Sequence, residues 1–100
     1  MLFRSSHILA FDDINPQAPV HTLVIPKGKY VSMKDFSENA SEAEIAALMR
    51  AVGKVAEIKG VKESGFRILA NAGGDAHQEV PHLHIHIFGG RPLGPMLVRK

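Results

Sequence analysis

The clearest pattern of polar and apolar positions lies near the C-terminal end, where the two kinds alternate from His82 to Phe88 (HLHIHIF). Because successive side chains of a strand point to opposite faces, this period of two predicts a β-strand with one polar and one apolar face. Three further segments, bounded by turn-forming residues, predict strands over residues 2–11, 21–26 and 66–71. A short edge strand is expected over residues 30–33.

One helix interrupts these strands. Ser41 and Glu44 form an S-x-x-E capping box, which is typical of a helix start, and Gly60 is the usual left-handed residue that follows a helix end. Between them, apolar residues recur at steps of three and four and predict one buried stripe, made of Ile45, Leu48, Met49, Val52, Val55 and Ile58. The pattern predicts a helix of roughly 17 residues.

Strands, then one long helix, then two more strands indicate an α+β fold, with a mostly antiparallel sheet of about five strands and the helix packed on it. The chain has 100 residues, which leaves no room for a second core, so we expect a single domain over residues 1–100.

Composition excludes several classes of function. Twelve cationic against ten anionic side chains give a net charge of +2, too little for a concentrated basic patch, so no nucleic acid partner is expected. With no cysteine, disulfides, cysteine zinc sites and a thiol nucleophile are excluded. No signal-peptide core and no run long enough to span a membrane is present, so we expect a cytoplasmic protein with no membrane partner.

The polar face of the 82–88 strand carries the candidate chemistry. His82, His84 and His86 share that face at a spacing of ~6.6 Å, and each neutral imidazole offers one donor and one acceptor near neutral pH. A solvated edge strand is the ordinary alternative, but the opposite face is cleanly apolar. Three imidazoles in a row therefore indicate a functional surface.

Two kinds of chemistry suit these histidines. A zinc hydrolase would use the H-x-H pair, with a third ligand from His21, His77 or Glu79. Alternatively, one imidazole attacks as a nucleophile while the others position charge or move protons. The strand alone leaves both open. A Gly-containing loop and an Asn just upstream, without a cluster of carboxylates, favour the second.

The run HLHIHIF matches the H-φ-H-φ-H-φ-φ signature (φ, apolar) of the histidine-triad, or HIT, family, which this chain resembles. The resemblance extends over residues 10–27 (AFDDINPQAPVHTLVIPK) and 71–91 (NAGGDAHQEVPHLHIHIFGGR), and covers nearly the whole chain. It is closest to the Hint branch. This resemblance implies a HIT-like fold, a homodimer, no cofactor, and hydrolysis of purine nucleoside phosphoramidates or related nucleotidyl conjugates. The apolar surplus of so short a chain also favours a dimer.

The resemblance also implies unequal roles for four histidines. By position, His84 would be the nucleophile that forms a nucleotidyl-imidazole intermediate, with its other ring nitrogen donating to a backbone carbonyl. His86 would donate a hydrogen bond to the developing charge, while His82 and His21 orient the triad. No metal would be needed, because positively charged imidazole and backbone N–H groups neutralise the phosphate.

Nucleotide-binding positions follow from the same resemblance. Asp13 matches the acid that binds the ribose hydroxyls, Phe11 and Ile14 match residues beside the purine, and Asn71 matches an Asn near phosphate and ribose. Glu79 stands where members often carry a phosphate-contacting Ser. A carboxylate there would repel a phosphoryl oxygen unless it were turned away or paired with His77 or a lysine.

The family's usual N-terminal segment is shorter here, which leads us to expect weak discrimination between bases. The main alternative to the enzyme is a nucleotide-binding regulatory protein with little turnover, which the Glu79 and N-terminal departures favour. A zinc hydrolase built on the H-x-H pair is the less favoured one.

Overall fold

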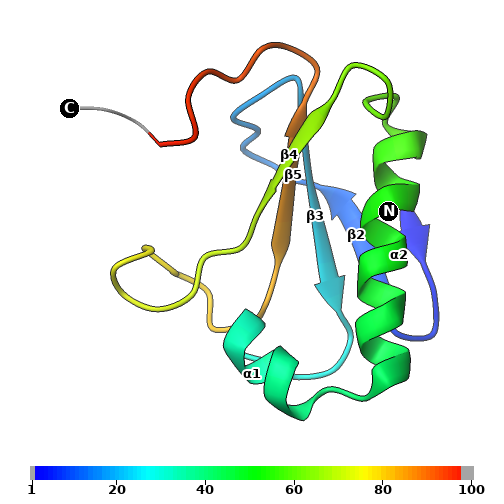
Figure 1. Ribbon diagram of the computed structural model, residues 1–100, viewed down its shortest axis with the longest axis vertical. Coiled ribbons are helices and arrows are strands. Elements are labelled where there is room, and N and C mark those ends of the chain that lie inside the picture. Colours follow the sequence, from blue (N-terminus) through cyan, green and yellow to red (C-terminus); the bar gives the residue numbers. More distant parts are fainter. Residues whose placement is uncertain (1, 98–100) are drawn as a thin grey trace.

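The computed structural model describes residues 2–97 and shows a five-stranded antiparallel sheet with two helices (Figure 1). The strands are β1 (Phe3–Arg4), β2 (Ile8–Asp12), β3 (Val20–Pro26), β4 (Phe66–Leu69) and β5 (Ile85–Gly89), and the helices are α1 (Met33–Asn39) and α2 (Glu42–Ile58). Their order in the sheet is β1-β2-β3-β5-β4. The predicted α+β class, antiparallel sheet and long helix are confirmed, and the short helix α1 was not predicted.

Helix α2 begins and ends where the sequence predicts. The Ser41 side chain accepts a hydrogen bond from the Glu44 N–H, and the Glu44 carboxylate accepts one from the Ser41 N–H, so the capping box is complete. Gly60 lies just beyond the helix with a φ of 73°, a left-handed conformation that costs glycine little.

The buried face of α2 differs from the predicted stripe. Leu48, Val52 and Val55 are buried as expected, but Ile45, Met49 and Ile58 are partly exposed. Ala51 and Ala56 are buried in their place. Packing against the sheet thus selects a face with two small side chains, and hydrophobicity alone does not distinguish it from the predicted stripe.

The N-terminal strand is divided in two. Residues 5–7 form a turn in which the Ser5 hydroxyl accepts hydrogen bonds from the His7 and Ile8 N–H groups. The result is an antiparallel β1–β2 pair in which Phe3 lies opposite Ala10. The prediction of one strand over residues 2–11 is therefore wrong, because a serine turn interrupts it.

Residues 30–33 do not form the predicted edge strand. Instead they lead into α1, whose N-cap Ser32 accepts from the Asp35 N–H while the Asp35 carboxylate accepts from the Val31 N–H at 2.7 Å. Tyr30 ties this segment to α2, because its hydroxyl donates to the Glu44 carboxylate. Local capping therefore outweighs the β-propensity of Tyr30 and Val31.

The sheet has two distinct faces. Ile8, Val24, Ile85 and Ile87 point to the face that α2 covers, where they form the core with Leu48 and Val55 (Figure 1). Around β5, Leu83, Ile85 and Ile87 are buried while His82, His84 and His86 are half-buried, so the predicted alternation is confirmed. Regular strand structure begins only at Ile85, because β3 pairs with β5 no further than Val24 opposite Ile85.

Within residues 2–97, neither helix is long and apolar enough to cross a bilayer.

Candidate functional site

The face of the sheet opposite α2 carries a hollow of about 380 Å³. The register of the strands determines the wall of this hollow. Leu23 on β3 lies between Phe11 on β2 and His86 on β5, and all three side chains are on one face. Apolar side chains and the triad share its wall, which consists of Phe11, Asp13, Leu23, Ile25, Val80, His82, His84 and His86. The fold thus places the three predicted triad histidines beside an apolar pocket.

A second cavity of about 250 Å³ adjoins the same histidines and is more polar. Its lining residues come from the β2–β3 loop, the β4–β5 loop and the triad, and are Gln17, Asn71, His77, Gln78, Glu79, Val80, His84 and His86. His84 and His86 border both cavities, so a ligand that fills the two spaces would pass these imidazoles.

His84 has a fixed ring orientation. Its Nδ1 lies 2.8 Å from the backbone oxygen of His82, as the resemblance led us to expect. A carbonyl oxygen only accepts hydrogen bonds, so Nδ1 must carry the proton and Nε2 of the neutral ring keeps a free lone pair. The His82 ring is fixed in a similar way, because its Nε2 donates to the backbone oxygen of Pro26 at 3.0 Å.

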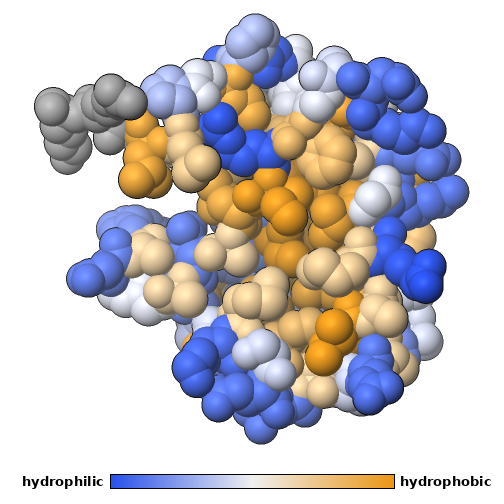
Figure 2. Space-filling model, viewed as in Figure 1, coloured by the Kyte–Doolittle hydropathy of each residue, from blue (hydrophilic) through white to orange (hydrophobic). Residues whose placement is uncertain are grey.

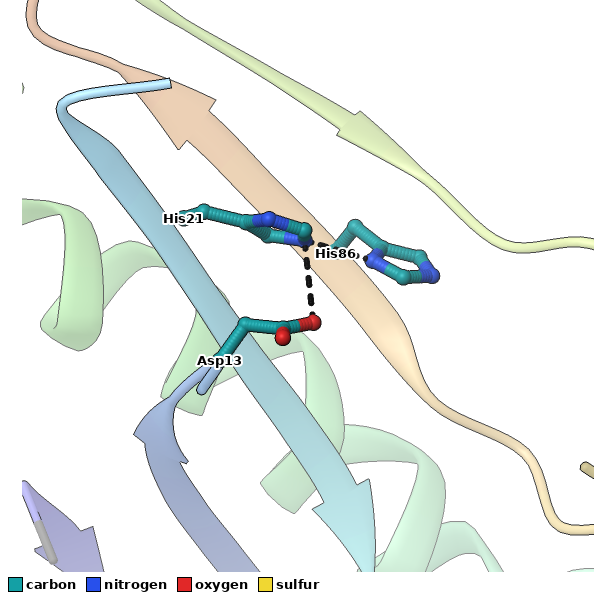
Figure 3. A group of neighbouring side chains, drawn as sticks. All are labelled: Asp13, His21 and His86. Carbon is teal, nitrogen blue, oxygen red and sulfur yellow. Dashed lines mark hydrogen bonds and ion pairs between the residues drawn. The ribbon is translucent and has the colours of Figure 1, made fainter. Parts of the chain in front are cut away.

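A second chain of hydrogen bonds fixes His21 and His86 (Figure 3). The Gln17 N–H donates to Nδ1 of His21 at 3.1 Å, so the proton of the neutral His21 ring lies on Nε2. That nitrogen is 2.9 Å from Nδ1 of His86 and donates to it. Nδ1 of His86 is therefore an acceptor, and Nε2 of His86 carries the hydrogen that can bind a ligand.

Burial keeps these two rings uncharged. It lowers the pKa of His86 to about 4, helped by repulsion from His84 and His21 and opposed by Asp13. Burial also lowers the pKa of His21, while Asp13, 3.5 Å from its Nε2, acts in the opposite direction. With this lowered pKa, His86 is a neutral N–H donor at neutral pH.

Metal binding was one interpretation of the H-x-H pair. Among residues 2–97 the only group of three side chains that could hold an ion is Asp13, His21 and His86, which does not include His82 or His84. In that group the His21 and His86 nitrogens are already joined by a hydrogen bond, and the other His21 nitrogen accepts from Gln17. The geometry therefore gives the H-x-H pair no third ligand within the described part of the chain.

The remaining predicted residues divide between the two cavities. Phe11 and Asp13 line the apolar one, and Asn71 and Glu79 line the polar one. Ile14 is 92% exposed and lines neither, because the chain turns away from the sheet after Asp13.

Sequence reasoning missed several lining residues. Leu23 and Ile25 alternate with His21 along β3, so the period of two could have placed them on the histidine face. Gln17 donates to His21 through its backbone N–H, and the identity of a side chain does not predict a backbone contact of this kind.

Comparisons with known proteins identify the family and the fold. The model of the HIT domain family matches residues 1–93. An uncharacterised 13.2 kDa HIT-like protein of Azospirillum brasilense is 64% identical over 98 residues, covering 98% of this chain and 80% of that protein. The purine nucleoside phosphoramidase of Escherichia coli (strain K12) is 39% identical over 100 residues, covering 100% of this chain and 83% of that enzyme. A solved HIT family hydrolase from Clostridium thermocellum has a TM-score of 0.85 at 40% identity, covering 96% of this chain and 83% of that one.

The lowered pKa of His86 makes stability depend on pH. Between its ordinary value of 6.5 and about 4, the unfolded chain binds a proton at His86 that the folded chain does not. Stability from this residue is therefore present above pH 6.5 and is lost as the pH falls toward 4. We expect the urea midpoint of the wild type to fall more steeply over this range than that of His86→Gln, and the NMR titration of the His86 ring to have its midpoint near 4. A midpoint near 6.5 would contradict the burial argument.

Proposed function

Because the chain belongs to the HIT family, we propose that it hydrolyses nucleoside phosphoramidates or related nucleotidyl conjugates through a covalent nucleotidyl-histidine intermediate on His84. One observation carries the proposal. The contact of 2.8 Å between Nδ1 of His84 and the His82 oxygen leaves Nε2 with a free lone pair on a ring that borders both cavities. An unprotonated, oriented imidazole nitrogen is what nucleophilic attack requires.

In this proposal the nucleotide lies across the two cavities. A purine would pack against Phe11, Leu23 and Ile25, and the Asp13 carboxylate would accept hydrogen bonds from the ribose hydroxyls. The phosphorus would then face His84, with Asn71 beside it. The leaving group would occupy the polar cavity of the β4–β5 loop.

The reaction has two steps. Nε2 of His84 forms a bond to phosphorus while the phosphorus–nitrogen bond to the amine breaks, and the departing nitrogen takes a proton from solvent. Water then attacks phosphorus and releases a proton to solvent, and the bond to Nε2 breaks to restore the neutral ring. Throughout, Nδ1 of His84 keeps its hydrogen bond to the His82 oxygen, which stabilises positive charge on the ring.

The other histidines position groups and stabilise charge. Nε2–H of His86 donates to the phosphoryl oxygen or leaving group, where negative charge develops. His21 acts through His86, because it holds the donor on the correct nitrogen. His82 acts through its carbonyl group, and its own ring is held by Pro26.

We further propose a cytoplasmic enzyme without a nucleic acid partner. A chain with no cysteine is compatible with a reducing compartment, and a net charge of +2 provides little attraction for a polyanion.

A homodimer is also part of the proposal. Strand β4 is the last strand of the sheet, so one of its edges pairs with no strand among residues 2–97, and Ile68 on it is 48% exposed. Met49 of α2 is 49% exposed and lines an apolar groove together with Ile68. Figure 2 shows apolar side chains gathered over β4 and the adjoining face of α2. Two copies that placed β4 beside β4 would cover this surface and pair both edges.

Replacing the nucleophile tests the catalytic proposal. We expect His84→Asn to lower kcat/KM for an adenosine phosphoramidate by on the order of 10⁴-fold, because the variant lacks the nitrogen that forms the intermediate. Acid quenching of the wild-type reaction should yield protein that is heavier by one nucleotidyl group, and peptide mapping should place that group on His84.

His7→Asn is the matched control, since His7 lies in the turn between β1 and β2 and lines neither cavity. An undiminished rate in His84→Asn would refute the covalent mechanism. Tight nucleotide binding without turnover by the wild type would favour the regulatory alternative.

The dimer proposal predicts that the wild type sediments at twice the mass of the 10.9 kDa chain, whereas Ile68→Lys sediments as a single chain. A lysine at this position would bring two charges to the β4 edges in the dimer. Ile58→Lys is the control, because Ile58 is exposed to a similar degree but does not line the groove. A monomeric wild type would exclude this interface.

A further inference from the structure

The β4–β5 loop carries a carboxylate and an imidazole that the proposed mechanism does not use. We propose that Glu79, held by His77, determines leaving-group specificity: it favours nucleotidyl conjugates whose amine carries a second, positive charge and disfavours conjugates whose leaving group is anionic. This inference rests on the proposed function and specifies the substrate class further.

The loop that presents Glu79 is anchored by the side chain of Gln78. Its Oε1 accepts a hydrogen bond from the Gly73 N–H at 3.0 Å, and its Nε2 donates to the backbone oxygens of Val31 and Val80 at 2.6 and 3.1 Å. One amide thus joins both ends of the loop to the segment before α1. The residues on either side of Gln78 are therefore held at a defined place beside the triad.

His77 fixes the carboxylate. Its Nε2 lies 2.9 Å from Oε1 of Glu79, so the ring donates to the carboxylate. The His77 backbone has a φ of 60°, a left-handed conformation that is uncommon for a side chain other than glycine. Both side chains remain open to solvent, at 86% and 74% exposure, so a ligand in the cavity can reach the charge.

The charges that line the polar cavity explain why Glu79 would affect the leaving group. Its other lining residues are amides, a valine and histidines, so Glu79 provides the only carboxylate among the described residues that border it, and no lysine or arginine lines it. A phosphoryl group at His84 and His86 would lie at the other side of this space. A carboxylate or phosphate on the leaving group would be repelled by Glu79, whereas an ammonium group would be attracted.

The exposure of Glu79 to solvent limits how strongly it can discriminate between leaving groups. An exposed ion pair changes binding by a few-fold, so we expect about a threefold preference for a cationic over a neutral leaving group. A comparable factor should separate the neutral from the anionic one. Because the pair is exposed to solvent, added salt should reduce both factors.

Three matched substrates test the proposal: the adenosine monophosphate amides of putrescine, butylamine and γ-aminobutyrate. Their leaving groups have the same number of carbons and differ in terminal charge. For the wild type at low ionic strength, kcat/KM should fall in that order, by roughly tenfold from first to last. Glu79→Gln keeps the shape and the contact with His77 but removes the charge, so the ratio should approach one.

Glu57→Gln is the matched control. Glu57 is also an exposed carboxylate in an ion pair, with Lys54, but it lies on α2, across the sheet from the triad. This variant should keep the wild-type ratio. An equal ratio in wild type and Glu79→Gln, or a ratio that does not change with salt, would overturn the proposal, since a purely structural role for the pair predicts both results.

Binding separates this inference from the proposed function. If the wild type hydrolyses none of the three amides, the proposed function fails, and the dissociation constants of the amides for His84→Asn still test Glu79. In that background the same order of affinity supports the charge preference. Equal affinities, or an order that His84→Asn/Glu79→Gln also shows, refute it.

Discussion

The hydrogen bond from Nδ1 of His84 to the backbone oxygen of His82 is the constraint on which the proposed chemistry depends. Both residues belong to the alternating segment 82–88 and are two positions apart. The bond is therefore local and needs no residue from elsewhere in the fold. Because the acceptor is a carbonyl, the opposite nitrogen is left with its lone pair toward the cavities. Without that acceptor, the ring would be free to adopt the other tautomer.

The rest of the fold supports this orientation. Pairing of β3 with β5 places His21 close enough to His86 for a contact of 2.9 Å, and the Gln17 N–H determines the direction of that hydrogen bond. Burial lowers the pKa of both rings, so the chain of donors and acceptors consists of neutral groups at neutral pH. In the proposed mechanism, the directed N–H group of His86 therefore stabilises an anionic phosphoryl group without a charge on His86.

The features that sequence predicted are those set by local periodicity and local capping. The limits of α2 follow from the Ser41 capping box and Gly60, and the histidine face follows from the alternation of residues 82–88. What could not be predicted depends on tertiary structure: which face of α2 meets the sheet, the backbone contact of Gln17, and the neutral state of His86. The division of the first strand at Ser5 was missed because a serine turn has no effect on the hydrophobic pattern.

The tautomer of His84 is the most direct test of this mechanism. Long-range proton–nitrogen NMR correlations distinguish a protonated Nδ1 from a protonated Nε2 in a neutral imidazole ring. The structure predicts that, in the free protein, the neutral His84 ring carries its hydrogen on Nδ1 and that Nε2 is bare. A neutral ring with its hydrogen on Nε2 would contradict nucleophilic attack by that nitrogen.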